Sequence, residues 1–267
     1  MFRTFPPRNP LLMTPRLVTL VFAAGASLAI AQDRSPVEPE ALPAPDQSVE
    51  PAKPEVEQID ETRYRIGKVT LDKKTREIRF PAKVNMTEGL LEYLVVHQNG
   101  KVHESLLATD VSPTHINLAF TLLRYPASRE LYPLPSETGG ASNKYPEVPA
   151  EVKAGARVSI DVEWTEEGKT KRLPVNDWIQ HAVKTTAMPP GPWVYGGSDV
   201  FEGKFVPETT GDISAIFVNP AAILNYTGED NKDDTVWLAY PKRVPAEGTN
   251  VTLIITPFSN QPAPTKP

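Results

Sequence analysis

The sequence predicts an α+β fold: predominantly antiparallel β structure with two or three short helices, in a single domain. Segments with strand-like alternation outnumber helical ones along the chain. An Asn-Gly pair, the strongest two-residue hairpin signal, joins two apolar segments at Asn99 and Gly100. Two helix starts, Ser112-Pro113 and Asn219-Pro220, place a capping residue before proline. Together these patterns favour a sheet assembled from hairpins.

The first half of the domain is predicted as two hairpins followed by a helix. Residues 64–71 alternate in polarity, and a polar turn leads into a second strand at 76–80. A two-residue turn at Asn99 and Gly100 would then pair the strand 90–97 with the strand 101–107. A helical stripe of apolar residues follows over residues 112–124.

The second half continues with a long loop and more strands. Residues 125–154 are rich in Pro, Gly, Ser and Tyr without periodicity, which is typical of a functional loop or an insertion. A hairpin is expected around Glu167 and Gly168. Two short helices are expected at 177–182 and 219–224. The remaining expected strands are 193–200, 204–206, 212–218, 236–240 and 251–256.

The N-terminal residues 1–31 have the pattern of a secretory signal peptide. Three arginines precede an apolar segment at 17–31, and Ala29 and Ala31 provide the small residues of a cleavage site, so the mature chain is expected to begin at Gln32. The segment is short for a membrane span, and no second apolar segment reaches that length. An uncleaved N-terminal anchor is the alternative. The sequence therefore predicts an exported protein, periplasmic or secreted.

The rest of the chain divides by composition. Residues 32–58 are dominated by Pro, Ala and Glu, so they are expected to form a disordered linker. Residues 59–258 are expected to form the globular domain, and 259–267 a disordered tail. Cysteine is absent, which removes disulfides, thiolate metal sites and cysteine nucleophiles. The net charge is −5, and it becomes −8 without the three arginines of 1–31, so nucleic acid is not an expected partner.

The segment 90–107 contains the candidate catalytic residues. Strand alternation would place Glu92, His103 and Ser105 on one face and Glu104 on the other. A triad is disfavoured because same-face neighbours on one strand stand roughly 7 Å apart, beyond hydrogen-bond reach. A metal site is disfavoured because His103 and Glu104 would point to opposite faces, and no cofactor is expected. The favoured interpretation is that these polar residues are paired and serve the fold.

Three further features of the sequence have a functional interpretation. Glu92 lies in an apolar strand, where it is either a paired structural charge or a pocket carboxylate with a raised pKa. The candidate ligand-binding residues are aromatic side chains in the long loop and a Gly-rich segment: Tyr132, Tyr145, Trp193 and Tyr195. The acidic segment 228–235 lacks the ligand pattern of an EF-hand and is interpreted as a solvated turn.

Residues 68–257 resemble the YdjY-like domain of exported bacterial proteins. The segments that carry the resemblance are Leu91-Glu92-Tyr93, residues 100–107, Asp110 with Pro113, residues 192–198, Gly211-Asp212-Ile213 and residues 244–251. The resemblance implies an exported bacterial context and no specific mechanism.

Two hypotheses for function remain open. The first is a binding or interaction module for an envelope protein or a small ligand. The alternative is a hydrolase or metal-dependent enzyme centred on Glu92, His103 and Glu104. An enzyme should bring these side chains together in one concave pocket.

Overall fold

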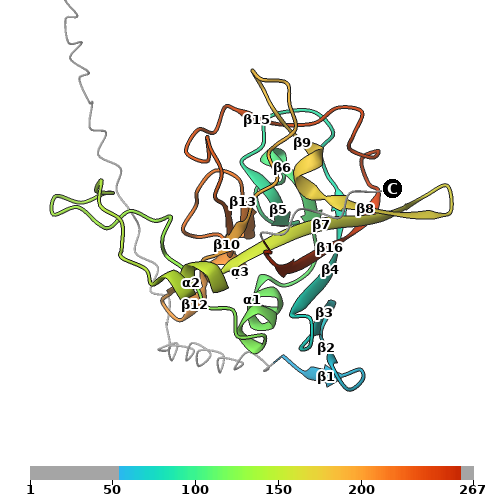
Figure 1. Ribbon diagram of the computed structural model, residues 1–267, viewed down its shortest axis with the longest axis horizontal. Helices are drawn as coiled ribbons and strands as arrows, with labels where there is room; N and C mark the ends of the chain where they lie inside the picture. The colour runs from blue at the N-terminus through green and yellow to red at the C-terminus, as the bar shows by residue number, and fades with distance from the viewer. Residues whose placement is uncertain (1–53, 260–267) are drawn as a thin grey trace, which may run out of the picture. The chain divides into compact units, whose positions relative to one another are not determined.

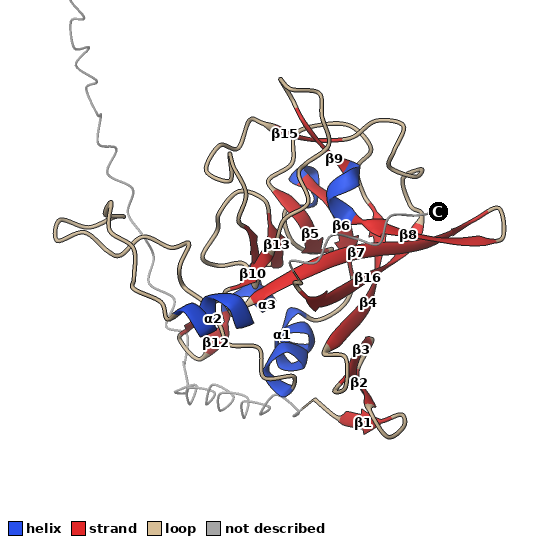
Figure 2. Ribbon diagram, in the orientation of Figure 1, coloured by secondary structure: helices blue, strands red, loops and turns tan. Residues whose placement is uncertain are grey.

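The computed structural model describes residues 54–259 and shows them as a mostly β structure (Figures 1 and 2). They belong to one compact unit. Three short α-helices and two 3-10 helices accompany the strands in this part of the chain. The helices are α1 (Pro113–Leu122), α2 (Ala150–Gly155), α3 (Val206–Thr210), η1 (Val102–Glu104) and η2 (Val175–Trp178). The strands are β1 (Val56–Gln58), β2 (Arg63–Ile66), β3 (Val69–Asp72), β4 (Glu77–Val84), β5 (Tyr93–His97), β6 (Ser105–Thr109), β7 (Arg157–Glu166), β8 (Lys169–Pro174), β9 (Ile179–His181), β10 (Trp193–Tyr195), β11 (Val200–Phe201), β12 (Lys204–Phe205), β13 (Asp212–Ala215), β14 (Leu224–Tyr226), β15 (Trp237–Ala239) and β16 (Asn250–Pro257).

The main sheet closes on itself into an eight-stranded barrel. Its strands follow the order β4-β16-β7-β10-β14-β13-β5-β6, and β6 pairs back onto β4. The pairs β5–β6 and β13–β14 are parallel, and the other pairs in the ring are antiparallel. The predicted fold class, an α+β fold of predominantly antiparallel strands, is therefore wrong. The domain is a mostly β, closed barrel of mixed direction with few helices.

The Asn99-Gly100 hairpin is the local prediction whose failure changes the topology. A type I′ turn needs positive φ at both central residues, and neither Asn99 nor Gly100 has it. Instead the chain passes through η1, and β6 lies parallel to β5, with Tyr93 opposite Ser105. Gly100 is needed for close packing, because a Cβ there would lie 2.9 Å from the carbonyl oxygen of Thr210. The glycine therefore serves a tertiary contact.

Other local predictions were partly right. The hairpin β7–β8 is confirmed, and its turn residues Glu167 and Gly168 both have positive φ. The predicted strand 64–71 is two strands, β2 and β3, which turn at Gly67. The predicted helices at 177–182 and 219–224 do not form, since η2 and β9 cover most of the first and β14 begins at the end of the second. The predicted loop 125–154 contains most of α2.

The helix α1 is confirmed, together with its cap. Ser112 Oγ accepts a hydrogen bond from the amide of His115, and Pro113 occupies the first turn. The helix buries Ile116, Ala119 and Phe120. The ring of Phe120 stacks on Tyr195 of β10 at 4.3 Å between centroids. Aromatic stacking thus ties the helix to the barrel.

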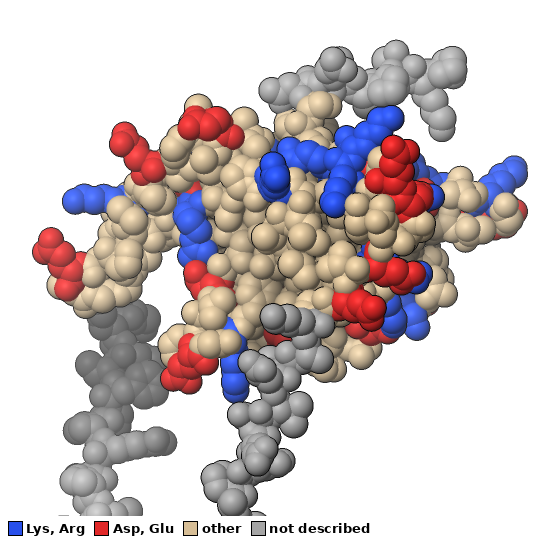
Figure 3. Space-filling model, turned by 90° about the horizontal axis from the view of Figure 1, so that it is seen from below, with Lys and Arg blue, Asp and Glu red and all other residues tan. Residues whose placement is uncertain are grey.

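The N-terminal boundary differs slightly from the sequence interpretation. Residues 56–58, at the end of the expected linker, form β1, which pairs with β2 and whose three residues are exposed. The rest of the expected linker and signal peptide, residues 1–53, and most of the tail, 260–267, lie outside the described residues. No helix within 54–259 is long and apolar enough to cross a membrane. On the face shown in Figure 3, basic and acidic side chains are interspersed.

Candidate functional site

A pocket of about 330 Å³ lies beside a small two-stranded sheet formed by β9 and β15. In this sheet His181 is directly opposite Trp237. Three chain segments complete the pocket: the turn after β9, the Pro-rich residues 189–192, and the segment that follows β14. The lining residues are His181, Lys184, Thr186, Pro189, Pro190, Gly191, Pro192, Tyr226, Thr227, Gly228, Glu229, Asp230 and Trp237. We call it the His181 pocket.

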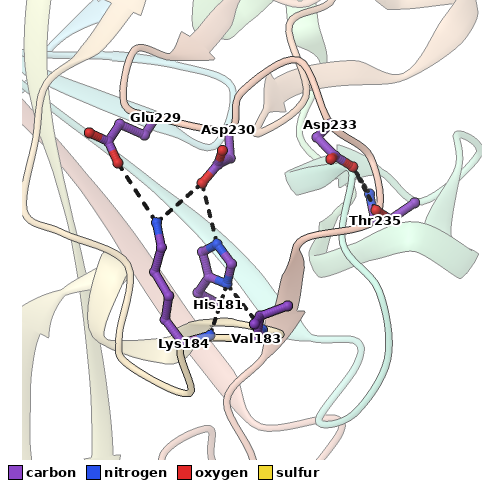
Figure 4. Close-up of polar contacts among 7 residues, drawn as sticks. All are labelled: His181, Val183, Lys184, Glu229, Asp230, Asp233 and Thr235. Atoms are coloured by element: carbon purple, nitrogen blue, oxygen red, sulfur yellow. Dashed lines mark hydrogen bonds and ion pairs between the residues drawn. The ribbon is translucent and has the colours of Figure 1, made fainter.

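His181 is buried, and both of its ring nitrogens have partners (Figure 4). Nδ1 accepts hydrogen bonds from the backbone amides of Val183 at 3.1 Å and Lys184 at 3.3 Å. The neutral ring therefore carries its proton on Nε2 and donates it to Asp230 Oδ2, 3.3 Å away. With both nitrogens engaged, the ring is held as a fixed wall of the pocket. It has no free nitrogen to act as a base or to bind a metal ion.

The mouth of the pocket carries one basic and two acidic side chains (Figure 4). Lys184 Nζ lies 3.7 Å from Glu229 Oε2 and 3.5 Å from Asp230 Oδ2. With His181 neutral, these three groups carry a formal charge of −1. Asp233, three residues after Asp230, accepts hydrogen bonds from the backbone amide and the hydroxyl of Thr235. These hydrogen bonds, the Thr235 hydroxyl first, lower the pKa of Asp233.

Aromatic rings form the inner part of the pocket. Trp237 lies 5.2 Å from His181 and 6.0 Å from Tyr226 between ring centroids, and both pairs are edge-to-face. Burial, reinforced by the charges of Glu229 and Asp230, raises the pKa of Tyr226 to about 12. Its hydroxyl therefore stays protonated at neutral pH and can donate a hydrogen bond.

The backbone around the pocket adopts conformations that require an explanation. There is no room for a side chain at position 228, because a Cβ on Gly228 would lie 2.1 Å from the Tyr226 hydroxyl. Thr185 and Asp230 have φ of 53° and 59°, in the left-handed region. This region is unfavourable for a β-branched residue such as threonine. Strain of this kind is often found at binding sites, where the surrounding structure holds it in place.

The hairpin candidates lie together in a second, shallower pocket of about 370 Å³. Glu92, His103 and Glu104 all line it, with Asp234 from the acidic segment. The prediction that His103 and Glu104 face opposite sides is wrong, because both belong to η1 and not to a strand. His103 Nε2 lies 3.9 Å from Glu104 Oε2. Because the His103 side chain is 78% exposed, the two residues do not form a buried pair. Burial, followed by the nearby Glu104, raises the pKa of Glu92.

Ser105 and the aromatic candidates are mostly structural. Ser105 is completely buried and donates its hydroxyl to the carbonyl of Leu107, so it is not available as a nucleophile. Trp193 and Tyr195 are buried in the core. Tyr132 is also buried and accepts a hydrogen bond from Asn225, and burial raises its pKa to about 12. Tyr145 is 42% exposed, and Lys232 lies over its ring. None of these five side chains lines the His181 pocket.

Sequence reasoning missed the His181 pocket. Its acidic part was visible as the segment 228–235, which was interpreted only as a solvated turn. The partner of that segment, His181, lies 49 positions before Asp230, and no spacing pattern joins them. An acidic segment followed closely by Trp237 was the one available signal. Within residues 54–259, no three His, Asp or Glu side chains converge as ligands for a metal ion.

Comparisons with known proteins identify the domain. The family model of the YdjY domain matches residues 69–256, which run from β3 to β16 and make up more than half of the chain. Neither the curated proteins nor the solved structures contain a match to this chain. The resemblance seen in the sequence is thereby confirmed, and the chain belongs to the YdjY domain family.

Proposed function

We propose that this YdjY domain is a non-catalytic binding module that holds a small molecule in the His181 pocket, and that the chain works outside the cytoplasm. The observation that carries the proposal is the fixed state of the pocket walls. His181 has both ring nitrogens engaged, and Lys184 is paired with two carboxylates. Such an arrangement provides shape and orienting groups, and its histidine has no free ring nitrogen to act as a base.

The size and lining of the pocket support a small ligand. Its volume of about 330 Å³ is at the lower end of the range of roughly 300–1,000 Å³ that is typical of ligand sites. Three prolines, Tyr226 and Trp237 supply apolar wall, and Lys184, Glu229 and Asp230 add charged groups. Apolar walls with few polar groups are the usual composition of sites that bind small organic molecules.

Export is supported by the N-terminal sequence. Residues 17–31 are apolar, follow three arginines and end in a small-residue cleavage pattern. The absence of cysteine is compatible with either side of a membrane. Cell fractionation tests this part of the proposal, and it fails if the chain remains in the cytoplasm.

Ligand binding is tested with the purified chain and a library of small soluble fragments. Trp237 lines the pocket, so a bound fragment should change the tryptophan fluorescence in a saturable way. Gly191→Leu should abolish the change, because a Cβ at Gly191 makes only ordinary contacts at 3.9 Å, and the longer side chain fills the space above Tyr226. Thr170→Leu, on the exposed strand β8, is the matched control and should bind normally. If no fragment binds, or if Gly191→Leu binds equally well, the pocket is not the site.

The second candidate function is hydrolysis at the pocket lined by Glu92 and Glu104. The observation that favours it is a carboxylic acid whose pKa is raised by burial and by a second carboxylate, which is the arrangement of a proton donor. Chromogenic ester, phosphate and glycoside substrates test it. Activity that disappears in Glu92→Gln and persists in Glu88→Gln would favour this candidate over the binding module.

A further inference from the structure

We infer that the ligand of the His181 pocket is a small organic cation, an amine or ammonium compound with an apolar body. This inference rests on the proposed binding function and specifies the chemistry of the ligand. It follows from three features of the pocket: the long contacts between the carboxylates at its mouth and their donors, the net charge of the mouth, and the aromatic wall.

The carboxylates at the mouth have unused capacity to accept hydrogen bonds. Charge-assisted N–H···O bonds are normally about 2.7–2.9 Å long. The contacts of Lys184 with Glu229 and Asp230 are 3.7 and 3.5 Å, and the contact of His181 with Asp230 is 3.3 Å. No other side chain among the described residues donates to Glu229 or Asp230. Both carboxylates are exposed to solvent, with 89% of the Glu229 side chain and 37% of the Asp230 side chain accessible, so a ligand ammonium group can donate to them in place of water.

The net charge of the mouth has the sign that attracts a cation. Two carboxylates face one ammonium group, because His181 in its neutral form contributes no charge. The same segment continues with Lys232, Asp233 and Asp234, whose formal charges sum to −1 and keep the sign negative. The raised pKa of Tyr226 agrees with this sign, because Glu229 and Asp230 contribute to it. An anionic ligand would meet repulsion from the same groups.

The inner wall suits the apolar part of such a ligand. Tyr226 and Trp237 line the pocket, and prolines at 189, 190 and 192 form its rim. Aromatic rings attract cations through the negative charge on their faces, and the combination of aromatic rings with carboxylates is a common way to hold an ammonium group. Lys184 already places an ammonium group at this mouth, which shows that the carboxylates accept one.

The test compares three ligands of similar size and different charge: benzylamine, benzyl alcohol and benzoate. Each is titrated into the purified chain near neutral pH, with isothermal calorimetry as the readout. Benzylamine should bind at least about fivefold more tightly than benzyl alcohol, a ratio that matches a partly exposed ion pair, and benzoate should bind most weakly. Equal or tighter binding of benzyl alcohol or benzoate overturns the inference about charge and leaves the proposed binding function standing. Failure of all three to bind also overturns the inference, and the fragment library then decides the binding function separately.

Variants of the mouth make the test specific to this pocket. Glu229→Gln and Asp230→Asn should each weaken benzylamine binding by about two- to fivefold, while benzyl alcohol binding stays unchanged. The Glu229 side chain is 89% exposed, so its substitution carries little risk of misfolding. Asp161→Asn, which removes an acid paired with Arg172 on the distant hairpin β7–β8, is the matched control and should bind as the parent does. Lys184→Met should strengthen benzylamine binding, because the competing ammonium group is gone. Unchanged affinity in all three mouth variants overturns the inference.

Discussion

The contact between Gly196 and Tyr132 allows a sharp test of whether Tyr132 is a packing residue or a ligand-binding one. Gly196 is buried just after β10, and a Cβ there would lie 2.1 Å from the Tyr132 hydroxyl but 3.0 Å from the ring carbon that carries it. Gly196→Ala must therefore displace the hydroxyl, and overpacking of this kind costs about 1–3 kcal/mol. Tyr132→Phe removes that hydroxyl and its hydrogen bond with Asn225, at a cost of about 1 kcal/mol.

The double variant should be more stable than the sum of the two single effects. In the Tyr132→Phe background the nearest atom to the new Cβ is at 3.0 Å, so the severe clash disappears and the ring needs to shift only slightly. We expect the free energy of unfolding of the double variant to be at least about 1 kcal/mol higher than the sum of the two single effects predicts. Coupling of this size is within the range seen for residues in contact. The assay is urea unfolding followed by the fluorescence of the four tryptophans. Strict additivity, or a Gly196→Ala variant as stable as the parent, would refute the packing of Tyr132 against this glycine.

Three further predictions concern charge, exposure and processing. Because the fold holds the pKa of Glu92 above its ordinary value of 4.5, ionised Glu92 destabilises the folded state at neutral pH. Glu92→Gln should therefore stabilise the domain at pH 7, with a gain that fades as the pH falls to 4.5 and below in urea titrations; a gain independent of pH would contradict this cause. His103→Ala should change the free energy of unfolding by less than about 0.5 kcal/mol, because its side chain is exposed, and a larger loss in the same assay would reveal a buried partner. N-terminal sequencing of exported chain should begin at Gln32, and an intact Met1 would indicate an anchor instead.

Two local patterns in this sequence predicted local structure correctly. The α1 cap at Ser112 and Pro113 and the hairpin turn at Glu167 and Gly168 are confirmed, because both depend on residues within a few positions of one another. The Asn99-Gly100 signal failed because the fold uses Gly100 for contact with the backbone near Gly211, more than a hundred residues later. Closure of a sheet depends on such distant contacts, and no local pattern encodes them.

The candidate site divides in the same way. Glu92 was correctly singled out as an unusual carboxylate, since an acid in an apolar strand is visible in the sequence itself. The assembly of Glu92, His103 and Glu104 in one pocket was expected only under the enzyme hypothesis, and it depends on η1 replacing the expected strand. His181 lies on β9, and Asp230 lies in the segment that leads to β15, the partner strand of β9; each of these two strands is three residues long. Strands this short give almost no alternation to detect.

The position of β16 in the barrel has a consequence for the order in which the chain can fold. This last strand lies between β4 and β7, so its pairing with β4 joins Val251 to Ala82 across most of the domain. Pairings between residues so far apart in sequence are slow to form, since a long loop must close before they stabilise anything. On a ribosome the barrel therefore stays open until β16 has been synthesised. A barrel that closes late leaves the domain without its complete fold during synthesis, which is compatible with the export proposed above.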